Sequence, residues 1–279
     1  MAFDIATNIN SLQAQVNTQM NSNSLSTSMQ RLSSGLRINS AMDDAAGLAI
    51  ATRMDSQYRG MNVAVRNAND GISLAQTADG GLSTLTNMVQ RMRELAVQAS
   101  NGTNTSGDLS AMNQEYTQLA AEVSRTVSSV QFNGQSLLDT SADFSFQVGA
   151  NSGQTITIAA SSLNVATGDL GAVATGTYDT LDTTNTSGNA ANISGLDLAL
   201  TAINNARANI GAVQSRFTNT IDFLQTAALN QDAAKGRIMD ANFAQETSNL
   251  SRAQILQQAG TAMVAQANQL PQGVLALLR

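Results

Sequence analysis

Residues 54–99 read MDSQYRGMNVAVRNANDGISLAQTADGGLSTLTNMVQRMRELAVQA, and this stretch decides the fold. Apolar or small residues recur along it at steps of three and four, with one slip around Ala75. This period predicts a single helix with a coiled-coil seam. Such a helix would extend roughly 69 Å, which is too long for a compact globule. The seam consists of Met54, Tyr58, Met61, Val65, Ala68, Ile72, Ala75, Ala78, Leu82, Leu85, Val89, Met92, Ala96 and Ala99.

A turn follows this helix, and a second helix follows the turn. The stretch NGTNTSGD at 101–108 is rich in turn-forming residues. Helical spacing then predicts a helix over 109–130, which Ser106 or Asp108 would cap. Its buried face is expected to hold Met112, Tyr116, Leu119, Val123 and Val127.

Helical spacing returns in the last third of the chain. It covers 196–228, is interrupted by KGRIMDANFAQET, and resumes as a final helix that Pro271 is expected to end or kink. Small residues repeat every seven positions in this final helix and would let a neighbouring helix approach closely. The small residues are Ala253, Gly260 and Ala267, and a second heptad row holds Leu256, Met263 and Leu270.

One region has a period of two. The alternation over 144–148 and the TITI run at 155–158, joined by GANSG, predict a β-hairpin. The following residues, 161–194, contain few large apolar side chains, and we expect a loosely folded surface segment there. The fold class is therefore mainly α, with long coiled-coil helices and a small β-hairpin region.

The composition excludes several kinds of site. Cysteine and histidine are both absent, and Lys235 is the only lysine. Disulfides, histidine-containing triads and histidine-ligated zinc are therefore impossible. The net charge is −6, and no basic residue lies between Arg125 and Arg207, which argues against nucleic-acid binding. No apolar run is long enough to span a membrane, and no cofactor or metal site is expected.

The chain also begins without an ordinary secretory signal. The stretch MAFDIATNINSLQAQ has neither a basic segment nor an apolar core. On these grounds alone we expect a soluble protein that stays in the cytosol or leaves it by a route without such a signal.

The residues RLSSGLRINSAMDDAAGLAIATRM at 31–54 contain the best acid pair, Asp43 and Asp44. Adjacent residues on a helix point about 100° apart and do not converge on one substrate. A metal site would need more ligands nearby. We therefore interpret this stretch as a joint between two helices. The SSG sequence ends the first, Ser40 caps the second, and both aspartates lie in its first turn. Arg31 and Arg37 are candidate ion-pair partners within or between subunits.

The two ends of the chain share an absence of charge. Residues 1–30 contain one charged side chain, Asp4, and residues 253–278 contain none. Both ends nevertheless have amphipathic spacing, which at the N-terminal end involves Ile5, Ile9, Leu12, Val16 and Met20. Uncharged polar faces suit helices enclosed on all sides, where a charge would be costly and amides can pair. This pattern favours assembly into a larger structure over packing within one monomer alone.

Several long stretches resemble bacterial flagellin. They include RLSSGLRINSAMDDAAGLAIA, RNANDGISLAQTADGGL, QRMRELAVQASNGTNTSGDL and VQFNGQSLLD, and near the end SRAQILQQAGTAMVAQANQLPQGVLALL. The resemblance covers roughly residues 1–150 and 195–279. It implies three parts: an inner coiled-coil domain lining a channel, a helical rod domain, and a short surface segment between. These are residues 1–40 with 245–279, residues 41–138 with 195–244, and residues 139–194.

The resemblance also implies a function and partners. The chain would be a non-enzymatic subunit that polymerises into the flagellar filament for swimming, outside the cell. It would be exported unfolded through the flagellar type III apparatus, with a chaperone on the C-terminal helix near 253–279. Cap and hook-junction proteins would be further partners. The implied core-assembly residues are Ile5, Ile9, Leu12, Val16, Leu256, Met263 and Leu270, and the implied joint contacts are Arg31, Arg37, Asp43 and Asp44.

In some members of the family, Toll-like receptor 5 recognises a surface on the rod. The matching positions here are Gln90, Arg91, Leu95 and Glu115, in and after QRMREL. Arg91 and Glu115 would equally serve as interhelical or intersubunit polar contacts.

Two other functions remain open, a hook–filament junction protein of the same superfamily and a secreted coiled-coil adhesin or effector. Ser/Thr-rich residues at 160–190 are candidates for O-glycans.

Overall fold

The computed structural model describes residues 7–166, 169–174, 178–184 and 189–277, with the backbone alone at 169, 174 and 270–277. The chain forms two compact units. Unit 1 is Met1–Ser56 with Asn230–Arg279, and unit 2 is Gln57–Leu229. The helices are α1 (Ile9–Ser34), α2 (Ala45–Ala99), α3 (Ser106–Ser129), α4 (Ala160–Leu163), α5 (Asp169–Ala174), α6 (Asn189–Met239) and α7 (Phe243–Leu277). The predicted mainly α fold class is confirmed.

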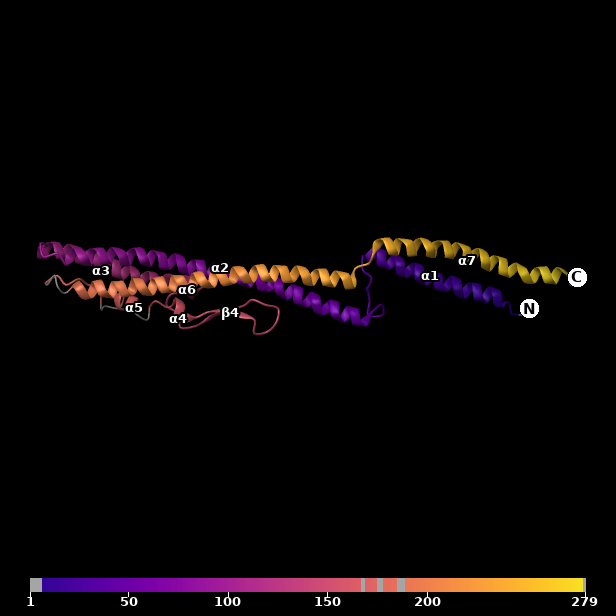
Figure 1. Cartoon of the computed structure of the whole chain (residues 1–279), viewed down its shortest axis with the longest axis horizontal. Helices are drawn as coiled ribbons and strands as arrows, with labels where there is room; N and C mark the ends of the chain where they lie inside the picture. Colours follow the sequence, from indigo (N-terminus) through magenta and orange to yellow (C-terminus); the bar gives the residue numbers. More distant parts are fainter. Residues whose placement is uncertain (1–6, 167–168, 175–177, 185–188, 278–279) are drawn as a thin grey trace. The chain divides into compact units, whose positions relative to one another are not determined.

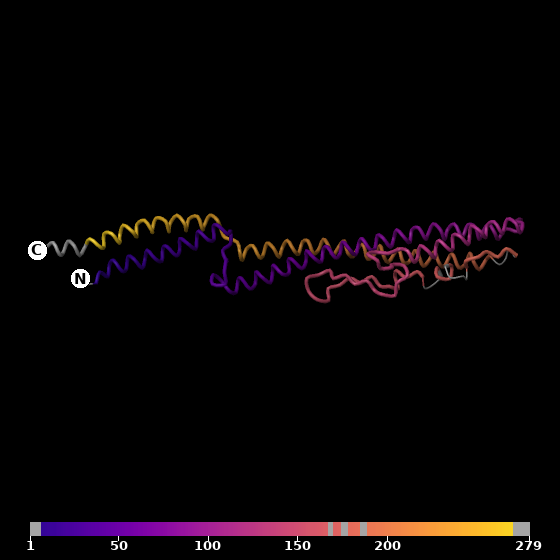
Figure 2. Tube along the Cα trace, turned by 180° about the vertical axis from the view of Figure 1, so that it is seen from behind, coloured from indigo at the N-terminus to yellow at the C-terminus, as the bar shows by residue number. Residues whose placement is uncertain are grey.

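Each unit has its own helix packing. In unit 1, α1 and α7 lie side by side along most of their length, as both views show (Figures 1 and 2). In unit 2, α2, α3 and the first part of α6 (labelled in Figure 1) bury one continuous apolar core. The two small strand pairs are β1 (Gln131–Phe132) with β2 (Gln135–Ser136), and β3 (Phe144–Gln147) with β4 (Thr155–Ile158).

The seam predicted on the long helix is confirmed in its second half. From Ala68 to Ala99 every predicted member is buried except Ile72, which is half-buried. Met54, Tyr58, Met61 and Val65 are only half-buried, so the tightly packed part of the seam begins near Ala68. Aromatic side chains complete this core: the ring of Phe217 packs edge-on to that of Phe146, with centroids 5.6 Å apart.

The start of α3 differs from the predicted cap. Thr105 is the N-cap residue: its side chain accepts from the Asp108 backbone N–H, and the Asp108 carboxylate accepts from the Thr105 backbone in return. This reciprocal capping box satisfies two backbone donors that a helix start otherwise leaves unpaired. Ser106 and Asp108 were therefore the wrong choices for the N-cap, although Asp108 belongs to the same motif.

The capping box makes the free energy of unfolding depend on pH in the acidic range. Hydrogen bonds from the side chain and backbone of Thr105 lower the pKa of Asp108 below its ordinary value of 3.8. Because the folded pKa is the lower one, the stabilisation is fully present above pH 3.8 and is lost as the pH falls through the folded value. Asp108→Asn should flatten this part of the pH dependence. Urea titrations of the parent protein and the variant from pH 6 down to pH 2 would measure the free energy of unfolding at each pH. If this free energy changed equally with pH in both proteins, the role of the cap would be contradicted.

The predicted hairpin is confirmed, and a second, smaller one accompanies it. Strands β3 and β4 pair antiparallel from Phe144 opposite Ile158 to Gln147 opposite Thr155. Strands β1 and β2 pair around Asn133 and Gly134, both of which have positive φ. Two consecutive positive φ angles are typical of the tight turn that Asn-Gly favours.

The expectation of a loosely folded surface segment is wrong for much of 161–184. Five apolar side chains there are almost fully buried, namely Leu163, Val165, Leu170, Val173 and Leu181. Polar anchors hold the segment in place. The Tyr116 hydroxyl donates to the Tyr178 carbonyl at 2.8 Å, and the Asn113 side chain accepts from the Leu181 backbone at 2.8 Å. Burial is the main cause that raises the pKa of Tyr116, which stays a neutral donor.

The C-terminal helices are longer than predicted. The interruption at KGRIMDANFAQET shrinks to three residues, Asp240–Asn242, because α6 continues to Met239 and α7 begins at Phe243. The backbone of α7 remains helical past Pro271 to Leu277, so the proline does not end the helix.

Two glycines of α2 should respond oppositely to a methyl group. A Cβ at position 71 would lie 2.6 Å from the Phe217 ring, whereas nothing lies within 4 Å of one at position 80. Gly71→Ala should therefore destabilise unit 2 by about 1–3 kcal/mol through overpacking. Gly80→Ala should stabilise it by up to about 1 kcal/mol through helix propensity. Thermal unfolding of the two variants measures the difference, and a shift of the same sign in both would contradict this packing.

Candidate assembly surface

The contact between α1 and α7 is built from small side chains. Ser11, Ser28, Ala253 and Ala267 are buried in it. At Gly260 the helices are so close that an added Cβ would lie 2.7 Å from the Thr18 hydroxyl oxygen. The predicted close approach along the small-residue heptad is thereby confirmed. Small side chains let the two helices approach closely in this pair.

Side-chain amides fix the register at the open end of the pair. The Asn8 side chain caps α1 by accepting from the Ser11 backbone, and its NH₂ group donates to the Ala267 carbonyl at 2.8 Å. The Ser11 hydroxyl donates to the Asn268 side chain at 2.7 Å. This arrangement agrees with the expectation that amides pair where charges are missing.

Large apolar side chains of the two helices are exposed. The exposed fraction of these side chains ranges from 44% at Leu256 to 65% at Ile255. We call this set the outward stripe: Ile9, Leu12, Val16, Met20, Ile255, Leu256 and Met263. Ile5 and the Leu270 side chain lie outside the described residues. The described residues of the chain leave about half of the stripe's surface uncovered, which is the mark of a surface that another molecule covers.

An ion pair fixes the opposite end of α1 to α7. Arg31 Nη1 lies 3.2 Å from Glu246 Oε1, and the Glu246 side chain is 9% exposed. Arg37 has a different role: its guanidinium donates to the Ile238 carbonyl at 2.7 Å, near the end of α6. Its backbone N–H donates to the Met239 carbonyl, and the Ala241 N–H donates to the Gly35 carbonyl. These bonds clamp the two connecting segments of unit 1 together.

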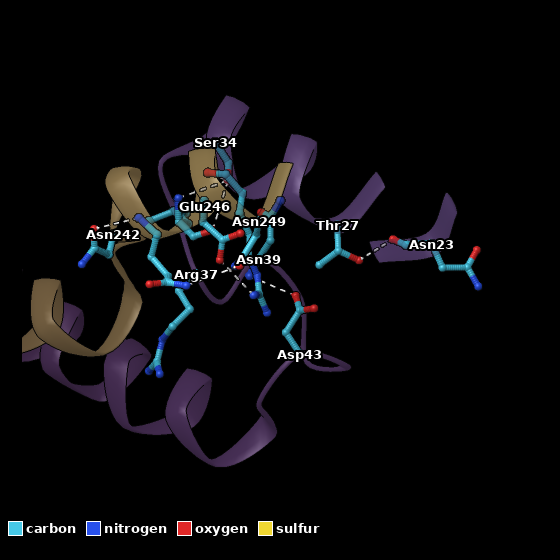
Figure 3. A network of polar contacts seen from close by, with 12 residues as sticks. Asn23, Thr27, Ser34, Arg37, Asn39, Asp43, Asn242, Glu246 and Asn249 are labelled. Carbon is cyan, nitrogen blue, oxygen red and sulfur yellow. Dashed lines mark hydrogen bonds and ion pairs between the residues drawn. The ribbon is translucent and has the colours of Figure 1, made fainter. Parts of the chain in front are cut away.

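The joint between α1 and α2 contains a tight turn, in which the Asp43 N–H donates to the Ser40 carbonyl. Helix α1 ends at Ser34, with Gly35 in the left-handed conformation, as the SSG sequence predicts. The predicted cap at Ser40 is wrong, because α2 starts at Ala45 and its Gly47 N–H donates to Asp44. Asp43 lies outside the helix, where it accepts from Asn39 and Ser40 (Figure 3). The backbone bonds from Ser40 and Asn39 lower its pKa.

The four residues of the predicted receptor surface divide into two groups. Gln90, Arg91 and Glu115 are exposed on α2 and α3, whereas Leu95 is 2% exposed and belongs to the core. Arg91 is paired across the helices: its Nε lies 2.8 Å from Glu115 Oε1 and its Nη1 3.0 Å from Glu94. The interhelical role considered for Arg91 and Glu115 is therefore present in the structure.

Within the described part of the chain, no three acidic residues gather in a way that could hold a metal ion. None of the described helices is long and apolar enough to cross a membrane.

Two profiles of one family match this chain. The bacterial flagellin N-terminal helical region matches residues 5–143, and the bacterial flagellin C-terminal helical region matches residues 193–278. The chain belongs to the bacterial flagellin family. Membership makes it a structural protein, a subunit of the flagellar filament.

Two named flagellins that match over nearly their whole length agree with the assignment. Flagellin of Halalkalibacterium halodurans is 46% identical over 273 residues, which are 98% of each chain. Flagellin C of Vibrio cholerae is 34% identical over 376 aligned positions that cover both chains completely. The crystal structure of Bacillus cereus flagellin is 31% identical, with a TM-score of 0.49 over 61% of this chain and 94% of that one.

Two residues that join α1 to α7 in this flagellin, Glu246 and Asn8, were not predicted from the sequence. Glu246 was missed because its partner Arg31 lies 215 residues away in the chain. Asn8 was missed because a single amide in an Asn-rich segment carries no local signal. An acidic residue in the first turn of the last helix, facing a basic one in the last turn of the first, was the only available clue to the ion pair.

Proposed function

We propose that the outward stripe of α1 and α7 is the surface through which this flagellin packs against other copies of itself in the core of the filament. The carrying observation is the exposure of the large apolar side chains, combined with an α1–α7 contact made of small ones. Since the chain belongs to a filament-forming family, a second copy is the natural partner for this surface. A repeated, non-closing contact of this kind generates a helix of subunits.

Electrostatics supports the same arrangement. The described side chains of 7–30 and 253–269 carry no charge. Enclosing these helices completely between copies would therefore bury no unpaired charged group. At the joint end, Arg31 directly follows the uncharged stretch of α1 and is paired with Glu246. We infer that the predicted domain division follows the same logic, with the uncharged ends inside and the charged rod and 139–194 further out.

The remaining expectations are parts of this proposal. We infer export through the flagellar type III apparatus, a chaperone on the last helix, cap and hook-junction partners, an extracellular location, a role in swimming, and no catalytic activity. The exposed apolar side chains of α7 support the chaperone, because such a surface needs cover before assembly. Seeded growth of long filaments from pure protein separates this function from that of a junction protein or a secreted adhesin.

A receptor surface on the rod is a second, narrower proposal. Exposed Gln90, Arg91 and Glu115 support it, and buried Leu95 would act only by supporting the helix. Arg91→Ala should lower activation of cells bearing Toll-like receptor 5 without changing filament assembly. Equal activation by the variant and the parent protein would show that Arg91 is not part of the receptor-binding surface.

The self-assembly proposal is tested by changing polarity at constant shape. The double variant Val16→Thr, Met263→Gln places polar groups on the stripe, and Val16→Ile, Met263→Leu keeps it apolar. A buried unpaired polar group costs about 1–3 kcal/mol, and every 1.4 kcal/mol is tenfold. The polar variant should therefore need at least about tenfold more protein to polymerise from seeds, whereas the apolar variant should polymerise like the parent. Sedimentation of seeded filaments measures both, and equal critical concentrations would refute the proposal.

A further inference from the structure

The most exposed large apolar side chain among the described residues is Met42, at 92%. It stands on a turn held by hydrogen bonds. Asp43 Oδ2 accepts from the Asn39 and Ser40 backbone N–H groups and from the Ser40 hydroxyl, at 2.9–3.1 Å. The Asp43 N–H closes the turn onto the Ser40 carbonyl. A turn whose backbone is fixed by hydrogen bonds is prepared for contact with a partner, because little backbone freedom remains to be lost.

A polar groove of about 470 Å³ lies between α1 and α7 near their joint end. Its lining includes Ser24, Ser28, Arg31, Glu246, Arg252 and Leu256. Two buried atoms in it have no hydrogen-bond partner, Arg31 Nε and Glu246 Oε2. Glu246 as a whole is 7% exposed. Buried polar atoms in folded proteins are nearly always paired. Arg31 Nε–H is a donor that an arriving carboxylate would satisfy, whereas Glu246 Oε2 would accept from an N–H or O–H donor.

The turn and the groove are complementary in charge and polarity. The groove holds two arginines against one carboxylate, and the turn carries Asp43 and Asp44. Asp43 Oδ1 makes none of the hydrogen bonds among the described residues, since all three go to Oδ2. Leu256, which is 44% exposed, offers apolar surface to a methionine, and a methionine side chain adapts readily to irregular gaps. Charge complementarity of this kind fixes register between copies more than it adds affinity.

We propose that the turn at Ser40–Asp44 of one copy docks into the Arg31–Arg252 groove of a neighbouring copy, with Met42 against Leu256 and the aspartates toward the arginines. The inference rests on the proposed self-assembly and deepens it by naming two complementary surfaces of the contact. Within one chain the backbone hydrogen bonds from Ser40 and Asn39 lower the pKa of Asp43, and the charge of Arg31 already reaches this carboxyl and also lowers its pKa. The experiment below therefore separates contact between copies from contact within one chain.

The absence of native cysteine gives a clean test. Filaments are grown from an equal mixture of two single variants, Met42→Cys and Ser24→Cys, and are then oxidised. Ser24 is exposed and lines the groove. The matched control replaces Ser24→Cys by Ser26→Cys, which is also an exposed serine of α1 but does not line the groove. Because each chain has one thiol, any covalent dimer joins two copies, and a disulfide forms only where Cβ atoms approach to about 4 Å.

We expect a covalent dimer of Met42→Cys with Ser24→Cys in oxidised filaments, and none above background with Ser26→Cys. Adding Arg252→Glu to the Ser24→Cys chain should abolish the dimer, and adding Arg252→Lys should keep it. Intact filaments without the dimer would overturn the docking while leaving self-assembly in place. Contact within one chain predicts the same result, no dimer between copies. If the cysteine variants do not polymerise alone, each is copolymerised with excess parent protein on parent seeds. Failure of the parent protein itself to polymerise would overturn the proposed function.

Discussion

Replacing Gly260 by leucine should abolish filament growth at concentrations where the parent protein polymerises. Even a Cβ at this position would lie 2.7 Å from Thr18 Oγ1, so a leucine must push α1 and α7 apart. Overpacking of this kind costs about 1–3 kcal/mol, and sometimes more. The separation would also move the two halves of the outward stripe relative to each other. Seeded growth, followed by sedimentation, measures the loss.

A rescue experiment distinguishes this mechanism from general damage. The variant Gly260→Ala should assemble poorly, because its methyl group meets the Thr18 hydroxyl. Combining it with Thr18→Ala removes that hydroxyl and leaves the Thr18 Cβ position 3.6 Å away, an ordinary contact. Assembly should then recover. Non-additive behaviour is expected only of residues in contact, so a double variant as defective as Gly260→Ala alone would argue against this close approach.

Truncating Phe217 should cause the largest loss of stability in unit 2. Its ring is fully buried, packs edge-on to Phe146 and lies against Gly71. Phe217→Ala should therefore lower the free energy of unfolding by about 3–5 kcal/mol. Urea denaturation followed by circular dichroism measures this change.

The same helix supplies the control. Phe223 lies six residues further along α6 and is 69% exposed. Phe223→Ala should change the free energy of unfolding of the monomer by no more than about 0.5 kcal/mol. Similar losses in the two variants would mean that Phe217 is not a core residue.

The sequence predicted the helices better than it predicted their faces. Hydrophobic period alone located α2, α3 and α6, because burial in a long helix bundle repeats every few residues. In α1 and α7 the same period was present, yet large side chains are exposed and small ones are buried. Period cannot predict this exposure, because it identifies a face but not the molecule that covers it. Gly260 and its heptad neighbours were the residues that indicated the close contact correctly.

The errors have a common physical origin in contacts between distant parts of the chain. The segment at 161–184 was expected on the surface because its apolar residues are sparse and aperiodic. It is held down by Tyr116 and Asn113, which lie 62 and 68 residues from their partners. The cap of α2 was misplaced by four residues because Ser40 and Asp44 are both good caps by type. Leu95 was chosen from a matching motif, which carries no information on burial.

In the assembled filament, other copies of the chain should cover the outward stripe. Electron cryomicroscopy of the assembled filament tests this directly, because it shows what lies against Leu12, Val16 and Met263. We predict that these side chains are buried against α1 or α7 of neighbouring subunits, while Ser11, Ala253 and Gly260 remain in the contact within each subunit. Filaments in which the stripe faces water, or packs between α1 and α7 of one subunit, would contradict the account.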